Sequence, residues 1–252
     1  MIADPALAAP VHALFEYAGI ALGAAAYRHG RARSGEGGLT QPGNFAVIVG
    51  LLAGAAIGNK LVFLIERPDV WQRLLAGEAA WPGQSIVGGL IGGLLGVELA
   101  KWLTGQTRST GDAMVWPLAT GLVIGRIGCF LAGLHDDTYG NPTTLPWGLD
   151  LGDGLRRHPT PLYEMVFAIA LAWVLHRARP RLDAVPGLRF KLFLAAYLAW
   201  RLLIDGLKPV RVPYAGGLSG IQWVCGLALL AYLPFVHRAW RRVEAAVRPV
   251  GA

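Results

Sequence analysis

The chain has 252 residues, of which 54% are hydrophobic and only 15% are charged, and its formal net charge is +7. Soluble domains carry roughly 25% charged residues, so this composition excludes an ordinary soluble domain and predicts an all-α polytopic membrane protein. Basic residues in cytoplasmic loops explain the positive charge, so no nucleic-acid partner is expected. The two cysteines, Cys129 and Cys225, fall in apolar segments, which argues against a disulfide framework.

Seven apolar runs, separated by linkers rich in glycine and proline, predict seven transmembrane helices. In chain order they cover residues 11–27, 44–65, 84–104, 113–133, 160–176, 190–206 and 217–236. Because no linker is long enough to fold alone, residues 1–252 are expected to form one membrane domain with a small outward-facing loop region at 134–159. The first run is followed by arginines, the reverse of the order in a signal peptide, so no cleaved leader is expected.

The distribution of Lys and Arg predicts how the chain is oriented. Of the 23 basic residues, 14 lie on one side, in segments 28–43, 101–112, 177–191 and 237–252, and 6 lie on the other, in segments 67–83, 134–159 and 206–216. By the positive-inside rule, the C-terminus is cytoplasmic and the N-terminus lies outside.

Two arginines, Arg126 and Arg201, lie toward the outer ends of their predicted spans. An arginine within a span costs at least about 2.5–3.5 kcal/mol. One interpretation is that each side chain snorkels to the interface. The other is a shared anion site, in which two guanidinium forks hold the phosphate of a phospholipid head group. Asp205, one turn after Arg201, is placed to orient it, and Glu164 is expected to pair with an arginine or a proton.

Glycines surround Arg126 within the segment 125–133. Gly121, Gly125 and Gly128 have the small-residue spacing that lets membrane helices approach closely, as do the glycines of segment 88–96. The same glycines also leave room for an acyl chain between helices, and the sequence leaves both interpretations open.

The loop after this segment offers candidate bases. His135 is followed by Asp136 and Asp137, and a histidine oriented by a carboxylate can accept a proton. A solvated acidic loop is the alternative, favoured for Asp137. One His with two adjacent Asp lacks a firm metal-ligand spacing, so neither a metal site nor a cofactor is expected. His158, at the entry to the fifth run, is the second candidate base.

Three blocks of sequence carry a family resemblance. They are GRIGCFLAG at 125–133, RHPTPLYE at 157–164, and YLAWRLLID at 197–205 followed by GLSGIQ at 217–222. In this order they resemble the prolipoprotein diacylglyceryl transferase family, the bacterial inner-membrane enzymes that start lipoprotein modification. The family is also seven-spanning with its N-terminus outside, as the charge distribution predicts for this chain.

The resemblance implies that Arg126 and Arg201 hold phosphatidylglycerol. It also implies transfer of a diacylglyceryl group to the lipobox cysteine thiol of a prolipoprotein, with loss of glycerol phosphate, and His135 or His158 would then remove the thiol proton. Tyr17 matches a tyrosine of the family's first span. The substrate-binding residues suggested by these matches are Tyr17, Gly125, Gly128, Cys129, Gly133, Tyr163, Glu164 and Asp205.

The chain also departs from the family pattern. Cys129, Ala132 and Leu134 stand where the family has Asn, a second polar residue and Glu. Val87 stands where the family has a histidine. These departures indicate a divergent member or paralogue. Two alternatives follow: a phospholipid-dependent transferase with a different small-molecule or lipid acceptor, and a non-catalytic phospholipid-binding or transport protein.

Overall fold

The structure, a computed structural model, describes residues 2, 4–33, 41–79, 83–136 and 138–247. Seven long helices make up most of these ranges: α1 (Pro5–Arg33), α2 (Pro42–Glu66), α4 (Ile86–Thr104), α5 (Val115–Ala132), α6 (Thr160–Arg177), α8 (Leu188–Ile204) and α9 (Gly220–Val247). Each of the seven predicted runs falls on one of them, so the predicted all-helical class is confirmed. Asp137 lies outside the described residues.

Five helical segments of the described chain are long and apolar enough to cross a membrane: Ala6–Arg33, Gly43–Glu66, Ile86–Thr104, Gly111–His135 and Gly220–Ala246. Helices α6 and α8, with 18 and 17 residues, are near the short end of the usual spanning length of about 17–25 residues. Large apolar side chains are exposed on several helices, among them Leu14, Leu52, Leu95, Val166 and Leu230. An exposed apolar surface of this extent fits lipid contact, so the chain is a membrane protein.

The connections contain structure that the sequence did not predict. A short helix, α3 (Pro68–Leu75), follows α2, and α7 (Arg179–Leu182) follows α6. Strands β1 (Leu149–Asp150) and β2 (Arg156–Arg157) form an antiparallel hairpin in which Leu149 pairs with Arg157. The 3-10 turns are η1 (Gly111–Met114), η2 (Gly133–His135), η3 (Asp205–Leu207) and η4 (Ala215–Gly217).

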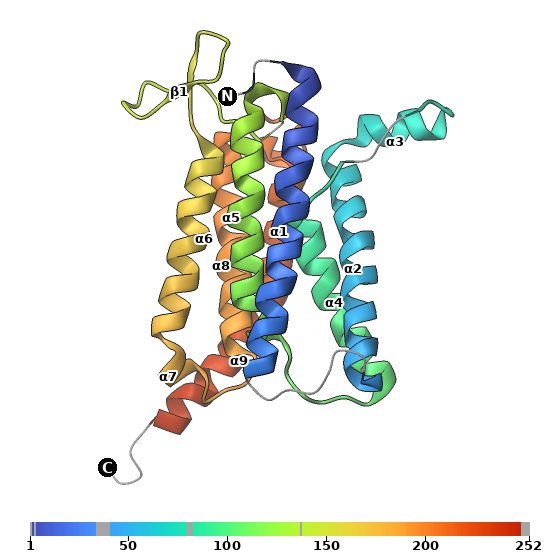
Figure 1. Cartoon of the computed structure of the whole chain (residues 1–252), viewed down its shortest axis with the longest axis vertical. Helices are drawn as coiled ribbons and strands as arrows, with labels where there is room; N and C mark the ends of the chain where they lie inside the picture. The colour runs from blue at the N-terminus through green and yellow to red at the C-terminus, as the bar shows by residue number, and fades with distance from the viewer. Residues whose placement is uncertain (1, 3, 34–40, 80–82, 137, 248–252) are drawn as a thin grey trace.

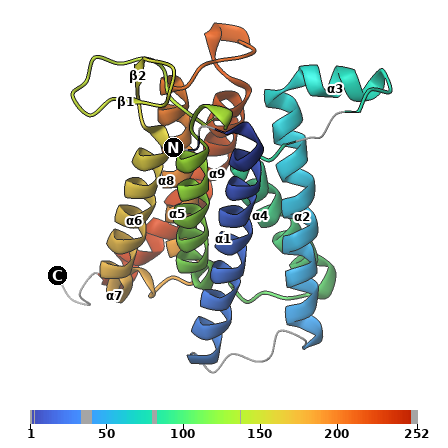
Figure 2. The same cartoon turned by 45° about the horizontal axis from the view of Figure 1, so that its top comes forward.

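The two ends of the helix bundle differ in what they carry. The start of α1, α3 and the hairpin lie at one end of the molecule, and the end of α9 lies at the other (Figure 1). The loop between α8 and α9 rises at the hairpin end as well (Figure 2). The connections that the charge distribution assigns to one side therefore share one end of the bundle.

Glycines set the closest helix contacts. Helix α2 packs along α4, with glycines of the two helices facing one another. A Cβ added at any of these glycines would overlap the backbone of the other helix. They are Gly50, Gly54 and Gly58 of α2 and Gly88, Gly92 and Gly96 of α4. In the pair α1 and α5, a Cβ at Gly128 would lie 2.8 Å from Cβ of Phe15. Gly125 has no such neighbour within 4 Å. The close-approach interpretation is therefore confirmed for Gly128, and the space beside Gly125 is open.

Helix α8 lies at the centre of the packing. Its Leu188 and Phe193 are fully buried in one apolar cluster with Val115 of α5 and Val243 of α9. Its Leu194, Tyr197 and Leu198 join a second cluster with Val87 and Leu90 of α4 and Cys225 of α9. Because α5, α6 and α8 contact one another, polar residues at their hairpin-side ends are brought together.

Candidate functional site

A buried carboxylate on α6 lies at the centre of the candidate site. Glu164 Oε2 is 2.6 Å from Nη2 of Arg126 on α5. Both carboxylate oxygens of Glu164 accept hydrogen bonds from Nη1 of Arg201 on α8, at 3.0 Å. Lys208 Nζ, just after η3, donates to Oε1 at 2.8 Å. All four residues are buried, so one acidic side chain joins three cations from three parts of the chain.

A second carboxylate holds Arg201 from its other side. Arg201 Nη2 donates to Asp205 Oδ1 at 2.9 Å, four residues along the chain. Asp205 Oδ2 accepts from Ser219 Oγ at 2.5 Å, and Ser219 in turn exchanges hydrogen bonds with Gln222 at the start of α9. The predicted Asp205–Arg201 and Glu164–arginine pairs are thus confirmed.

The charges of this cluster do not cancel. Arg126, Arg201 and Lys208 face two carboxylates, Glu164 and Asp205, so with all five groups ionised the cluster carries one net positive charge. The Nε atoms of Arg126 and Arg201 are buried and have no hydrogen-bond partner. Buried charge-bearing donors without partners are costly, so the cluster is suited to receiving an anionic group.

Lys208 was not among the site residues predicted from the sequence. It follows Arg201 by seven residues, and the η3 turn folds it back onto Glu164. Burial, reinforced by the nearby positive charge of Arg201, lowers the pKa of Lys208 to about 8. Its signal in the sequence was a lysine three residues after Asp205, close to the predicted Arg201–Asp205 pair.

A second group of side chains meets Arg126 on the α1 side. Arg126 Nη1 lies 3.5 Å from Sγ of Cys129, and the same sulfur lies 3.5 Å from Nε2 of His12 on α1. Asp136, beyond η2, lies close enough that its carboxylate, the sulfur and the imidazole all fall within 4.8 Å of one another. His12 was also missed, and a histidine in the first apolar run was its signal in the sequence.

A backbone turn at Gly133 connects Cys129 on α5 to Asp136, the two members of the second group that lie close in sequence. Gly133 ends α5 with a φ of +59°, a conformation that glycine adopts without steric cost. The following residues turn back through η2, and Asp136 N donates to the Gly133 carbonyl at 3.3 Å. The conformational need of this turn explains Gly133 in the 125–133 segment.

The two predicted bases occupy different settings. His135 is exposed at the end of η2, and its side chain makes no hydrogen bond or ion pair with the described residues. His158 is half-buried, with Nδ1 3.3 Å from the hydroxyl of Tyr163, which accepts from Trp147 Nε1 at 2.8 Å. Neither histidine contacts the cluster around Glu164.

Tyr17 also lies apart from the cluster. It is 68% exposed on the outward face of α1, in contrast to the buried Tyr197. Val87, at the position of the family histidine, is 1% exposed in the apolar cluster that includes Tyr197. No imidazole therefore stands at that position beside α8.

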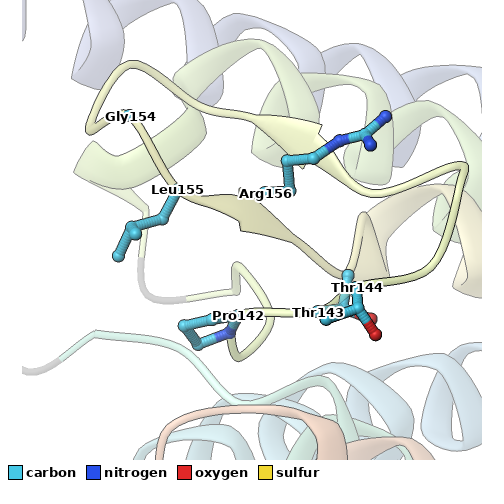
Figure 3. A pocket seen from close by; sticks show the side chains of 6 residues that line it. All are labelled: Pro142, Thr143, Thr144, Gly154, Leu155 and Arg156. Carbon is cyan, nitrogen blue, oxygen red and sulfur yellow. The ribbon is translucent and has the colours of Figure 1, made fainter.

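The hairpin end carries a shallow hollow, lined by Pro142, Thr143, Thr144, Gly154, Leu155 and Arg156 (Figure 3). Arg156 donates to the backbone carbonyls of Gly148 and Pro146, at 3.3 and 3.0 Å, so its charge serves the loop itself. None of the lining residues belongs to the Glu164 cluster, which makes this hollow a surface feature of the hairpin rather than the site.

These observations define an all-helical membrane protein with a buried arginine–carboxylate cluster near one end. The profile of the family described as prolipoprotein diacylglyceryl transferase matches residues 5–237. The chain belongs to this family, which confirms the resemblance seen in the three sequence blocks.

Several curated relatives carry the name phosphatidylglycerol–prolipoprotein diacylglyceryl transferase. The protein of Azoarcus sp. is 36% identical over 56% of this chain and 59% of its own length, and that of Cupriavidus necator is 32% identical over 60% and 58%. The protein of Nitrosomonas europaea is 30% identical over 78% of this chain and 72% of its own length. The matches to the first two thus cover little more than half of those relatives.

Proposed function

We propose that this chain transfers a diacylglyceryl group from phosphatidylglycerol to the cysteine thiol of a prolipoprotein. The observation that carries the proposal is the pair Arg126 and Arg201 joined through Glu164, with one unpartnered guanidinium nitrogen on each arginine. The names of the relatives support the donor and the acceptor. A cluster with net positive charge at one end of the bundle matches a phospholipid phosphate in charge and in depth.

The reaction is a substitution at carbon. The prolipoprotein thiolate attacks the glycerol carbon that is bonded to the phosphate oxygen, a C–S bond forms, the C–O bond breaks, and glycerol phosphate leaves with the electron pair. Arg126 and Arg201 stabilise the charge that develops on the departing phosphate. Glu164 and Asp205 hold the two guanidinium groups in place before the substrate arrives.

A base must take the thiol proton, and Val87 cannot serve. His135 and His158 stay the proposed candidates. His135 is exposed, and its side chain makes no hydrogen bond or ion pair with the described residues, so it is accessible to an acceptor at the surface. His158 is engaged with Tyr163, and its backbone bonds to Asn141 and Gly140 brace the loop, which fits a positioning role. Tyr17, Gly125, Cys129 and Tyr163 stay proposed contacts of the lipid.

We further infer seven membrane crossings within one domain, with the N-terminus outside and the C-terminus in the cytoplasm of a bacterial inner membrane. The charge distribution supports this orientation. Exposed Val166, Ile169 and Trp173 give α6 a lipid-facing side, and α8 needs little such surface because it is central. The topology is tested with single cysteines introduced at Asp153 and at Arg179. Each is labelled with a membrane-impermeant thiol reagent, first on intact cells and then after the membrane is opened. Labelling of both from the same side would contradict the topology.

The activity is tested with the purified full-length chain in phosphatidylglycerol vesicles containing a lipobox peptide. Mass spectrometry should show a peptide heavier by one diacylglyceryl group, together with free glycerol phosphate. The same reaction with a Cys→Ser lipobox peptide is the acceptor control. No product with the cysteine peptide would remove the proposed acceptor.

The non-catalytic alternative has its own signature in this assay. A lipid-binding protein would retain phosphatidylglycerol through purification and release no glycerol phosphate with any acceptor. A transferase with a different acceptor would release glycerol phosphate in a membrane extract but not with the peptide. The relatives' shared name favours the peptide reaction over both.

A further inference from the structure

Three possible metal ligands converge beside Arg126, from three separate stretches of the chain. They are the imidazole of His12 on α1, the thiol of Cys129 on α5 and the carboxylate of Asp136 after η2. Their ligand atoms all lie within 4.8 Å of one another. We propose that His12, Cys129 and Asp136 form a site for Zn²⁺ or a similar borderline-soft divalent cation.

The sulfur–nitrogen geometry fits zinc closely. Zinc binds thiolate sulfur at about 2.3 Å and imidazole nitrogen at about 2.0–2.1 Å in tetrahedral sites, which places the two ligand atoms about 3.5 Å apart. The observed separation of Cys129 Sγ and His12 Nε2 is 3.5 Å. The carboxylate of Asp136 lies at the end of a turn, with an oxygen within 4.8 Å of both other ligand atoms, so a small movement of this side chain would complete a set of three tetrahedral ligands.

The donor set also selects the ion. Thiolate, imidazole and carboxylate together suit zinc, cobalt and nickel, whereas magnesium and calcium take oxygen ligands. A divalent cation with one thiolate and one carboxylate is neutral overall. Arg126, which lies 3.5 Å from the sulfur, is balanced separately by Glu164. The site therefore adds no net charge to the buried cluster.

The surroundings hold the ligands in place and leave a path for the ion. Gly128 allows α1 to approach α5, because a Cβ there would lie 3.1 Å from the carbonyl oxygen of His12. Thr138 Oγ1 donates to Asp136 Oδ2 at 2.9 Å and orients the carboxylate. Cys129 is buried, whereas His12 and Asp136 are partly exposed at the hairpin end, so an ion can enter from water.

This site could not be predicted from the spacing of its ligands along the chain. His135 and its neighbours Asp136 and Asp137 lack a metal-ligand spacing in the sequence. In the structure the histidine comes from another helix, 117 residues before Cys129. Three protein ligands leave one tetrahedral position for water or another non-protein ligand. The inference concerns ion binding alone and does not depend on the proposed transfer reaction.

The test measures metal in the purified full-length protein in detergent. After dialysis against Zn²⁺ and then against metal-free buffer, elemental analysis should find about one zinc per chain. The variants Cys129→Ser and His12→Gln should each weaken zinc binding at least about tenfold, since even the loss of an outer-shell partner costs about 10–100-fold. Cys225→Ser is the matched control, because Cys225 is also a free, buried cysteine.

Cobalt supplies a second readout that reports the ligand itself. Co²⁺ bound by Cys129 should give a thiolate-to-metal charge-transfer band, absent in Cys129→Ser and retained in Cys225→Ser. The melting temperature of each variant without metal, compared with the wild-type value, separates lost ligation from lost folding. Wild-type protein that holds no zinc after dialysis would overturn the proposal. Zinc binding that survives in both folded Cys129→Ser and folded His12→Gln would overturn it as well.

Discussion

The carboxylate of Glu164 lies 2.6 Å from the guanidinium of Arg126, and both side chains are almost completely buried. Removing one partner of a buried pair is costly, by about 3–5 kcal/mol, because the other charge is left without compensation. Here Glu164 has two further partners, because it also binds Arg201 and Lys208. Loss of Arg126 therefore leaves Glu164 paired, whereas loss of Glu164 leaves three cations with Asp205 alone.

The first prediction concerns Arg126. Arg126→Ala should lower the rate of transfer by about 10²–10³-fold, the cost of removing one preorganised group that stabilises a developing charge. The protein should still fold, because Arg201 and Lys208 keep Glu164 compensated. Arg126→Lys should recover only part of the rate, since an ammonium lacks the planar fork. Product formation in phosphatidylglycerol vesicles measures the effect.

Arg179→Ala is the control for this experiment. Arg179 is an exposed arginine whose carboxylate partner, Asp183, lies 3.4 Å away on the surface. Its loss should leave the rate unchanged. Full activity in Arg126→Ala would show that the cluster serves stability rather than substrate.

The second prediction is a pH dependence of stability caused by Lys208. Its pKa is about 8 in the folded protein, against an ordinary value of 10.5. Between these two values the unfolded chain binds a proton that the folded chain does not, so the free energy of unfolding should rise as the pH increases through this window. Below pH 8 both states hold the proton and the contribution is constant.

Thermal unfolding in detergent, compared between wild type and Lys208→Met at several pH values, isolates this effect. The rise in stability above pH 8 should be smaller in the variant, since methionine keeps the apolar volume and removes the titrating group. Identical pH profiles for the two proteins would show that Lys208 is not held at a lowered pKa.

The third prediction separates the candidate bases. A base must be unprotonated to accept the thiol proton, so the rate should fall toward acid as an essential histidine becomes charged. We expect His135→Gln to lower the rate and to remove this acidic limb. His158→Gln should lower the melting temperature and leave the shape of the pH profile intact, because His158 contacts Tyr163 and braces its loop. An unchanged rate and limb in His135→Gln would assign it to the solvated surface.

The fourth prediction tests the glycine contact between α2 and α4. Gly92→Ala should destabilise the protein by about 1–3 kcal/mol, because the new Cβ would meet the backbone of Gly54 and Gly58. Gly89→Ala is the matched control. Gly89 lies three residues before Gly92 on α4, and a Cβ there would have Asn59 Cβ as its nearest neighbour, at 3.9 Å. This variant should be neutral or slightly stabilising. Thermal unfolding of both variants in one detergent distinguishes them, and equal melting temperatures would contradict the close contact.

Much of the helical framework was predictable from the chain alone. Apolar runs of spanning length predict helices whatever their neighbours are, and all seven runs are helical. The pairing of Arg201 with Asp205 was predictable for the same local reason, since residues four apart lie on one face of a helix. The cost of a charge within a span likewise marked Arg126 and Glu164 as residues that need partners.

The tertiary structure decided which partners these residues have. Three cations from α5, α8 and the η3 turn meet at Glu164, and His12 of α1 reaches Cys129 of α5. Such contacts depend on the rotation of each helix about its axis and on how closely its neighbour approaches. The sequence of one helix specifies neither quantity, because both result from packing against the other helices, at Gly128 through the absence of a single side chain.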